Sequence, residues 1–334
     1  MDASPTRDWP PVSVIMPVLD EERHLADAVA GVLAQDYPGE LELVLALGPS
    51  QDRTGEIAAS LAAADGRVRL VDNPAGCTPD GLNAAIKAAR YGVVVRVDGH
   101  GVLSPGYIEV AVEVLDRTGA ANVGGIMRAE GTTDFERAVA RAMTSPLGIG
   151  GARFHLGGEA GPVDTVYLGV FRRDVLERLG GYDEHFARAQ DWELNHRIRQ
   201  AGGTVWFSPD LVVTYRPRSS LRALAGQFFR TGQWRREVVR RYPDTANIRY
   251  LTAPVVTTAV GVGALAGLVG TLGGPRWLAL GWIAPAGYAA GVVMAGLVEG
   301  RGLPWRVRAW LPAVLATMHL TWGAGFLIGS HPRR

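Results

Sequence analysis

The chain has 334 residues, a formal net charge of +1 and a single cysteine, Cys77. This length exceeds that of a typical single domain, so we expect a catalytic domain joined to a further segment. The near-neutral charge gives no argument for nucleic-acid binding, and one cysteine excludes an intrachain disulfide and a multi-cysteine metal cluster. Residues 1–10 form a polar tail without the apolar run of a signal peptide, so we expect the following domain to stay in the cytoplasm.

The N-terminal part alternates between short apolar runs and segments of helical periodicity. The predicted strands are Val12–Val18, Leu41–Leu47, Val68–Val71 and a fourth that starts at Val93 and ends at Asp98. The predicted helices between them are Leu25–Leu33, about Gly55–Ala64, and a segment around Asn83–Ala89. This alternation predicts a doubly wound, mostly parallel α/β sheet, whose polar loops gather at the carboxyl ends of the strands.

Missing glycine-rich motifs weigh against two classes of nucleotide enzyme. The loop after the first strand carries Pro17 and the acidic run Asp20–Glu22, where a dinucleotide-dependent dehydrogenase has Gly-x-Gly-x-x-Gly. The chain also lacks the Gly-x-x-x-x-Gly-Lys-Ser/Thr loop of P-loop enzymes. A diphosphate ligand therefore needs another counter-charge.

The end of the fourth predicted strand offers such a counter-charge. Asp98 and His100 are two residues apart, and on an extended chain they share a face. A carboxylate and an imidazole at this edge of the sheet could hold a divalent cation. The alternative is that Asp98 caps a turn and His100 is a solvated loop residue.

Several motifs together resemble one enzyme family. They are Val-Ser-Val-Ile-Met-Pro-Val-Leu-Asp-Glu from Val12, Gly-Pro-Ser-Gln-Asp-Arg-Thr from Gly48, Asn83 ahead of a strand, and Val-Asp-Gly-His from Val97. This order resembles the GT-A fold of family 2 glycosyltransferases over roughly residues 11–234. The Asp-x-His form, with Gly124–Arg128 and Val163–Val166, resembles the succinoglycan-biosynthesis branch of membrane-attached transferases.

The resemblance implies a donor site. Its nucleotide-sugar-binding residues would be Pro17, Leu19, Glu21, Asp52, Asn83 and Asp98. Asp98 and His100 would hold Mn²⁺ or Mg²⁺ against the diphosphate. The family's usual motif is Asp-x-Asp, and His100 replaces the second acid. A neutral, softer imidazole should favour Mn²⁺ over Mg²⁺ or bind the diphosphate directly.

The resemblance also implies a general base. The pair Gln190-Asp191 at a predicted helix start matches the family's Glu-Asp or Gln-Asp pair, so Asp191 would take the proton of the acceptor hydroxyl. The alternative for Asp191 is an N-cap. Asp183, Glu184 and Glu193 are competing carboxylates.

Candidate acceptor contacts lie nearby in the sequence. They are Arg128, Arg153, Asp164, Gln190 and Trp192. An arginine can bind a lipid-linked phosphate, although a lone arginine is more often solvated or ion-paired.

Residues 216–250 carry nine arginines and two acids directly before an apolar region. Leu221, Leu224 and Phe228 have helical spacing, which favours an amphipathic helix on the membrane surface. The segment Gln227–Trp234 partly resembles the Gln-x-x-Arg-Trp signature of processive synthases, but Trp234 follows Arg230 by four residues, which favours transfer of a single sugar.

Three apolar runs follow, at Leu251–Leu272, Trp277–Val298 and about Trp310–Ile328. The first two are long enough to cross a hydrocarbon core of ~30 Å. The basic segment before them predicts a cytoplasmic catalytic domain on a multi-pass cell-membrane protein. Three spans would leave Arg333 and Arg334 outside, so the third run could instead be re-entrant or interfacial.

We therefore expect a tail (1–10), a GT-A domain (11–215), a basic interfacial segment (216–250) and a membrane domain of about three helices (251–330). The expected function is inverting, metal-dependent transfer of one sugar from a nucleotide-diphosphate sugar to a polyprenyl-linked acceptor, in contact with membrane lipids. The alternatives are a transferase acting on polyprenyl phosphate itself and a non-catalytic assembly subunit with a degenerate site.

Overall fold

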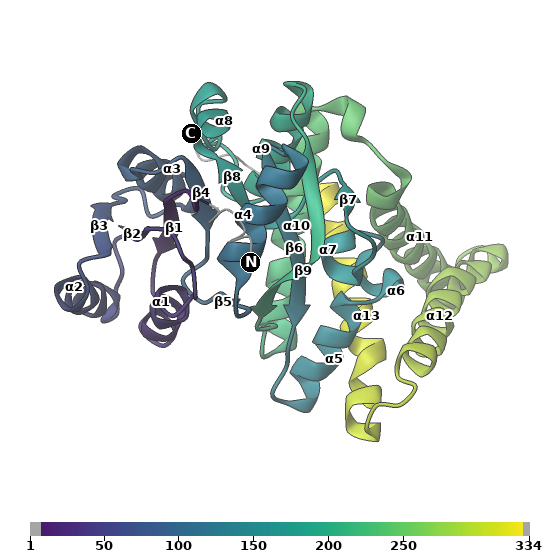
Figure 1. Cartoon of the computed structure of the whole chain (residues 1–334). Coiled ribbons are helices and arrows are strands. Elements are labelled where there is room, and N and C mark those ends of the chain that lie inside the picture. Colours follow the sequence, from purple (N-terminus) through teal and green to yellow (C-terminus); the bar gives the residue numbers. More distant parts are fainter. Residues whose placement is uncertain (1–7, 330–334) are drawn as a thin grey trace, which may run out of the picture. The chain divides into compact units, whose positions relative to one another are not determined.

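The computed structural model describes residues 8–329 and forms two compact units (Figure 1). The sheet unit comprises Met1–Arg128 and Gly157–Tyr215, and the helical unit comprises Ala129–Leu156 and Arg216–Arg334. The structure thus groups Ala129–Leu156 with the C-terminal helices, which the sequence did not indicate. Residues 1–7 of the expected tail lie outside the described residues, as do Arg333 and Arg334.

The sheet unit is built on one mixed sheet with the strand order β3-β2-β1-β4-β8-β6-β9-β5, and β7 pairs with β9. The strands are β1 (Val12–Val18), β2 (Leu41–Leu47), β3 (Val68–Asp72), β4 (Val93–Arg96), β5 (Val102–Leu103), β6 (Asn122–Ala129), β7 (Gly161–Pro162), β8 (Tyr167–Arg172) and β9 (Val205–Tyr215). Strands β3, β2, β1 and β4 are parallel, whereas β8 runs antiparallel to both β4 and β6. The predicted doubly wound α/β sheet is confirmed in its first four strands.

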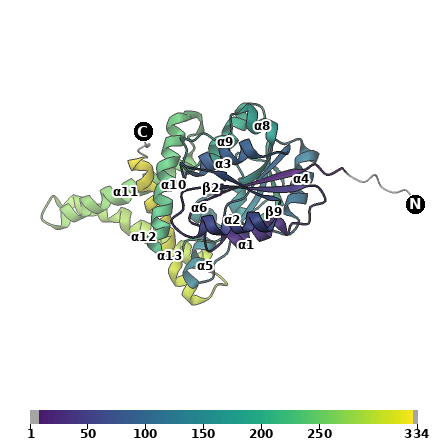
Figure 2. The same ribbon diagram turned by 90° about the vertical axis from the view of Figure 1, so that its left-hand side faces the viewer.

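Helices cover both faces of this sheet (Figure 2). They are α1 (Leu25–Leu33), α2 (Thr54–Ala64), α3 (Thr78–Ala88), α4 (Tyr107–Thr118), α8 (Arg173–Arg178) and α9 (Gln190–Gln200). Side chains alternate along β1: Val14 and Met16 join the core formed with α1, α2 and α4, whereas Ile15 joins the core formed with α3, α8 and α9. Because both faces are covered, the strands β1, β2 and β4 are apolar except at Ser13, Glu42 and Arg96.

Two predicted element limits were wrong. Strand β4 ends at Arg96, not Asp98, because Asp98 starts a turn in which its carbonyl accepts the Gly101 N–H at 2.8 Å. Asp98 and His100 therefore do not share a strand face. Helix α3 begins at Thr78, before the expected Asn83, since Pro79 in its first turn suits a helix start.

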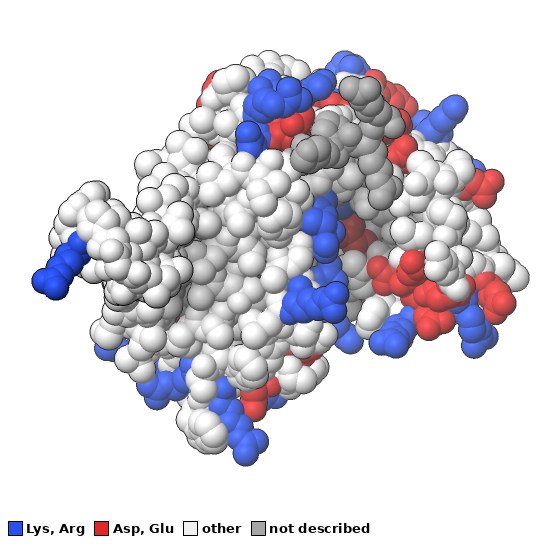
Figure 3. All heavy atoms as spheres, turned by 180° about the vertical axis from the view of Figure 1, so that it is seen from behind, with Lys and Arg blue, Asp and Glu red and all other residues white. Residues whose placement is uncertain are grey.

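The helical unit combines a short insertion with the C-terminal region. Its helices are α5 (Asp134–Met143), α6 (Pro146–Ile149), α7 (Arg153–Leu156), α10 (Leu221–Arg241), η1 (Pro243–Thr245), α11 (Ile248–Thr271), η2 (Arg276–Trp282), α12 (Ile283–Glu299) and α13 (Trp305–Ile328). Three stretches are long and apolar enough to cross a membrane: Tyr250–Thr271, Arg276–Glu299 and Trp305–Ile328. Apolar side chains such as Val255 and Leu265 are well exposed there, and Figure 3 shows a broad uncharged surface over α11 and α12.

Helix α13 differs from the other two apolar stretches because other helices cover it. At Gly325 an added Cβ would lie 2.0 Å from the Phe229 carbonyl oxygen of α10, and at Gly232 it would lie 2.0 Å from that of Trp322. Glycine at these two positions lets α10 and α13 approach closely. The apolar face of α10, which includes Leu224 and Phe228, is buried within the protein.

Candidate active site

The loop after β4 presents the predicted metal ligands. The side chain of Asp98 is 22% exposed and that of His100 is 38% exposed, so a ligand can reach both. The last residue of β4, Arg96, is almost fully buried. Its Nη2 donates to Asp98 Oδ1 at 3.1 Å.

The same guanidinium joins this loop to the predicted base. Arg96 Nη1 donates to Oδ1 of Asp191, a residue 95 positions away in the chain. Asp191 is the second residue of α9, and the N-cap is Ala189, in a left-handed conformation with φ of 62°. The N-cap alternative for Asp191 is therefore wrong. The Arg96 guanidinium thus brings together Asp98, from the predicted nucleotide-sugar site, and Asp191, the predicted base.

Arg96 remains charged in this environment. Burial, the largest single cause, acts to lower the pKa of its guanidinium, but the charge of Asp98, its hydrogen bond and the nearby Tyr182 and Tyr167 together raise the pKa overall. The ring of Tyr182 lies 5.7 Å from the guanidinium carbon and adds a cation–π contact. The group of Arg96, Asp98 and Asp191 carries one net negative charge.

Asp52 braces the loops that follow β1 and β2. Its carboxylate accepts the backbone N–H groups of Glu22 at 3.1 Å and Thr54 at 2.9 Å. The Thr54 hydroxyl also donates to it, and this bond is the main reason that the pKa of Asp52 is lowered. Glu21 N–H donates to the same hydroxyl oxygen at 2.7 Å, so both loops are tied together.

The other residues of the predicted nucleotide pocket lie on the same part of the sheet. Pro17 is half-buried on β1, and Leu19, just beyond this strand, is 40% exposed. The predicted loop convergence at the strand ends is thus present, while nucleotide binding by these residues stays a prediction.

His100 and Glu21 form a pair with Nδ1 and Oε1 2.7 Å apart. A carboxylate only accepts hydrogen bonds, so Nδ1 carries the proton, and in a neutral ring Nε2 then carries the lone pair. A carboxylate partner of this kind commonly orients histidines that ligate metals. Gly99 permits this approach, since an added Cβ would lie 3.1 Å from Glu21 Cγ.

Metal binding by Asp98 and His100 stays a prediction, and the two side chains alone would need further ligands. Within residues 8–329 no three His, Cys, Asp or Glu side chains form a metal cluster. Asp98 and His100 offer one carboxylate oxygen and one imidazole nitrogen, a set that suits Mn²⁺. The remaining ligands would be oxygens of the diphosphate.

Asn83 acts on the turn before α9. Its amide nitrogen donates to the Tyr182 carbonyl at 2.9 Å and to Glu184 at 3.1 Å, and its oxygen accepts the Tyr182 N–H at 2.8 Å. Gly181 has a φ of 73°, and an added Cβ there would lie 2.5 Å from the Asn83 side-chain oxygen, so this close approach requires glycine. A donor contact by Asn83 stays a prediction; its visible role is to hold this turn.

The competing carboxylates have other partners. Glu193 is fully buried and pairs with Arg197 at 2.6 Å, and Glu184 accepts the Asn83 amide. Asp183 accepts the backbone N–H of His185 at 3.0 Å. Of these carboxylates, Asp191 is the one that shares Arg96 with Asp98 in the loop after β4.

The predicted acceptor residues are scattered. Arg128 and Asp164 are exposed in the sheet unit, and Gln190 is half-buried at the first position of α9. Trp192 is buried and stacks on His196 with ring centroids 5.3 Å apart, so it offers little surface to a ligand. Arg153 is exposed on α7 in the helical unit.

Sequence reasoning missed Arg96. The available signal was a single charged residue inside the otherwise all-valine strand Val93–Arg96, where burial of an unpaired charge is very unfavourable. Tyr182, which lies against Arg96, carried no such signal.

Comparison with known proteins identifies the family. Residues 13–180 match the model of glycosyl transferase family 2. The chain is 31% identical over 318 residues to the succinoglycan biosynthesis protein ExoA of Rhizobium meliloti, covering 94% of this chain and 93% of that protein. This protein belongs to glycosyltransferase family 2 and is a glycosyltransferase.

More distant relatives agree with this assignment. The chain is 23% identical to a dolichyl N-acetyl-alpha-D-glucosaminyl phosphate 3-beta-D-2,3-diacetamido-2,3-dideoxy-beta-D-glucuronosyltransferase of Methanococcus voltae, covering 69% of this chain and 74% of that protein. Among solved structures it resembles the mannosyltransferase PcManGT from Pyrobaculum calidifontis, determined with GDP-Man and Mn²⁺, at 19% identity and a TM-score of 0.62. That alignment covers 96% of this chain and 91% of PcManGT, and it shows that the fold is GT-A.

Proposed function

We propose that this enzyme transfers a single sugar, with inversion, from a nucleotide-diphosphate sugar to a polyprenyl-diphosphate-linked saccharide during cell-surface polysaccharide synthesis. The observation that carries the proposal is the Arg96 guanidinium, which holds the Asp98 and Asp191 carboxylates side by side. The name of the Rhizobium meliloti relative supports polysaccharide synthesis, and that of the Methanococcus voltae relative supports a lipid-linked acceptor.

In the proposed reaction the acceptor hydroxyl oxygen bonds to the anomeric carbon while the bond from that carbon to the diphosphate breaks. Asp191 takes the hydroxyl proton, and the nucleoside diphosphate leaves on the opposite face with the bonding electrons. Asp98 and His100 would hold Mn²⁺ or Mg²⁺, which when bound neutralises charge on the diphosphate. Glu21 orients His100, and the loops braced by Asp52 shape the nucleotide pocket.

The test compares Asp191→Asn with Glu184→Gln in the full-length purified protein. Release of nucleoside diphosphate from a panel of nucleotide sugars with Mn²⁺ is measured with and without a lipid extract as the acceptor source. We expect Asp191→Asn to lower kcat by about 1000-fold while nucleotide binding persists, because general base catalysis typically contributes 10²- to 10⁴-fold. Glu184→Gln should leave kcat within about threefold, since the substituted amide still accepts the Asn83 hydrogen bond.

Other outcomes identify the alternatives. Full turnover by Asp191→Asn would discard the base and favour polyprenyl phosphate, whose anionic oxygen needs little base. A wild-type protein that binds but never cleaves any nucleotide sugar would indicate a non-catalytic assembly subunit.

We also propose that α11 and the η2–α12 stretch cross the membrane, that the domain at 11–215 faces the cytoplasm, and that α13 lies in the interface. Along the chain, α5 lies between the two segments of the sheet unit and α10 follows the second segment. Within the described residues all three candidate spans come later, after residue 249. Both α5 and α10 should therefore lie on the cytoplasmic side.

Helices α5 and α10 contact opposite ends of α13. Phe135 of α5 packs on Trp310 with ring centroids 5.3 Å apart, and Gln233 of α10 donates to the Gly329 carbonyl at 2.8 Å. These ends are ~28 Å apart along a helix. An α13 that crossed the bilayer would carry one of these polar helices to the far side.

Cysteine labelling distinguishes the two arrangements. In a Cys77→Ser background, Ile328→Cys, at the exposed end of α13, should react with a membrane-impermeant maleimide only from the cytoplasmic face, and Leu272→Cys, between the two spans, only from the outer face. Labelling of both from outside would show that α13 spans.

A further inference from the structure

Arg96 occupies a position where a charged residue is costly. It is the last residue of β4, beside Ile15 of β1, and it is only 3% exposed. Apolar replacements of buried ion pairs are often neutral or stabilising, so stability alone does not explain an arginine here.

The geometry of the guanidinium is that of a fork. Nη2 meets Asp98 Oδ1, Nη1 meets Asp191 Oδ1, and Nε is buried without a hydrogen-bond partner among the described residues. Because the guanidinium is rigid and planar, it sets the spacing of the two carboxylates. Each carboxylate spends Oδ1 on this contact, so Oδ2 is the oxygen that can meet a substrate or cation.

We infer that Arg96 is a positioning residue for sugar transfer, which fixes the Asp191 carboxylate beside Asp98 so that base and donor site act on the same anomeric carbon. This inference rests on the proposed function. It assigns Arg96 no contact with substrate: the residue acts through Asp191, and its charge offsets the repulsion between two neighbouring carboxylates.

The effect on the donor side should have the opposite sign. A guanidinium next to Asp98 repels any cation held by that carboxylate. Removing the positive charge should therefore leave Mn²⁺ binding intact or tighter, while Asp191 loses its anchor. A merely structural residue would lose both properties together.

The experiment uses the full-length protein and four variants: Arg96→Met, Arg96→Lys, Asp191→Asn and the double variant Arg96→Met/Asp191→Asn. Steady-state kinetics give kcat and the donor KM, and Mn²⁺ binding is followed by electron paramagnetic resonance without substrate turnover. Thermal unfolding shows whether each variant is folded.

Arg96→Met should lower kcat by about 100-fold, the typical cost of misplacing a catalytic group by about 1 Å, with the donor KM changed by no more than about threefold. Mn²⁺ should bind at least as tightly as in the wild type. The double variant should be no slower than Asp191→Asn alone, because residues that act through one another are not additive. Arg96→Lys restores the charge but not the fork, so its kcat should stay about tenfold low.

Three results would overturn the inference: a kcat near that of the wild type in Arg96→Met, losses that multiply in the double variant, or Mn²⁺ binding that falls in step with kcat. If Arg96→Met does not fold, Arg96→Lys provides the test, and a wild-type kcat in Arg96→Lys would contradict the inference. A wild-type protein that transfers no sugar would contradict both the proposed function and the inference. An active wild type whose kcat is unchanged in Arg96→Met would contradict the inference alone.

Discussion

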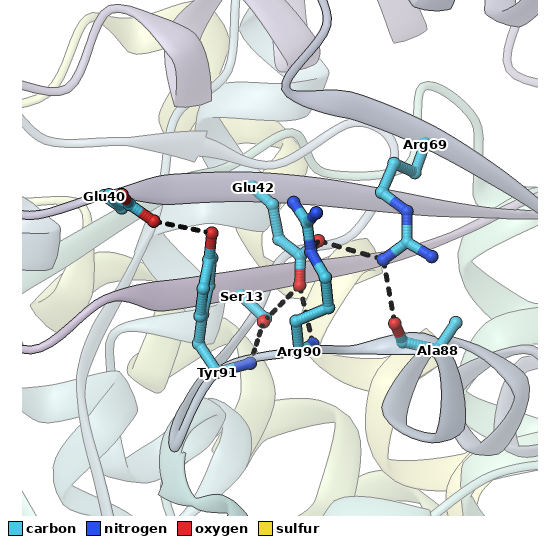
Figure 4. Close-up of polar contacts among 7 residues, drawn as sticks. All are labelled: Ser13, Glu40, Glu42, Arg69, Ala88, Arg90 and Tyr91. Carbon is cyan, nitrogen blue, oxygen red and sulfur yellow. Dashed lines mark hydrogen bonds and ion pairs between the residues drawn. The ribbon is translucent and has the colours of Figure 1, made fainter.

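Two buried charged residues, Glu42 and Arg96, lie at opposite ends of the parallel strands of the sheet unit, and they differ in how their hydrogen-bonding partners are used. Glu42, near the start of β2, is fully buried, and Figure 4 shows Ser13, Arg69 and Arg90 converging on it. It accepts hydrogen bonds of 2.7 Å from the Ser13 hydroxyl, the Arg90 N–H and Arg90 Nε, and one of 3.0 Å from Arg69. Both of its oxygens are satisfied by the scaffold.

Arg96, at the end of β4, is also buried, but Asp98 and Asp191, the carboxylates that neutralise it, each contact it through Oδ1 and keep Oδ2 for another partner. Glu42 is thus a closed site and Arg96 an open one, whose partners retain capacity for a ligand. Burial of a charge therefore does not by itself indicate function, and neither does exposure of its partners, since Arg69 and Arg90 are 37% and 54% exposed. The unused hydrogen-bonding capacity of the groups around the charge is the better indicator.

The largest effect should come from the open site. Asp98→Asn should lower kcat by about 1000-fold, because charge stabilisation by a metal contributes several kcal/mol. Mn²⁺ binding should weaken in parallel, and chelation of the metal should abolish wild-type activity. Kinetics and Mn²⁺ titration measure both, with Asp27→Asn, an exposed position on α1, as the control; unchanged Mn²⁺ affinity in Asp98→Asn would contradict the metal assignment.

The closed site should respond in stability instead. Glu42→Gln should lower the free energy of unfolding by about 2 to 3 kcal/mol, since hydrogen bonds to a buried charged group are lost. The kcat per folded molecule should not change. Chemical denaturation and kinetics on the same preparation test this, and a variant with full stability but low kcat would erase the contrast with Arg96.

The free energy of unfolding should depend on pH through Glu42. Burial acts to raise the pKa of Glu42, but its hydrogen bonds to Ser13, Arg90 and Arg69 outweigh this, and the pKa is lowered below the ordinary 4.5. The unfolded state then binds the proton more tightly, so the contribution of Glu42 is complete above pH 4.5 and is lost as the pH falls through the lowered pKa. Unfolding measured below pH 5 should show a steeper acid loss in the wild type than in Glu42→Gln.

Asn83 should give the smallest effect. Asn83→Ala removes the hydrogen bonds that hold the turn at Tyr182, which should lower the free energy of unfolding by about 1 to 2 kcal/mol. We expect kcat to fall a few-fold, about three- to fivefold, with the donor KM unchanged. A rise in donor KM at constant kcat would instead support the predicted donor contact.

Most local elements and the family could be predicted from neighbouring residues alone. Short apolar runs placed β1 and β2 correctly to the residue, and longer apolar runs located the C-terminal helices. Both signals are local, so neighbouring residues contain them in full. The resemblance of its motifs to family 2 glycosyltransferases implied a transferase with Asp98 and Asp191 as its central carboxylates.

The contacts between these residues depend on the folded chain. The antiparallel pairing of β8 with β4 and the Asn83 contact with the following turn bring the start of α9 to Arg96. The pairs His100 with Glu21 and Arg141 with Glu299 also join residues far apart in the chain. No local period encodes such contacts, because they depend on strand order and on which buried charges must find a partner.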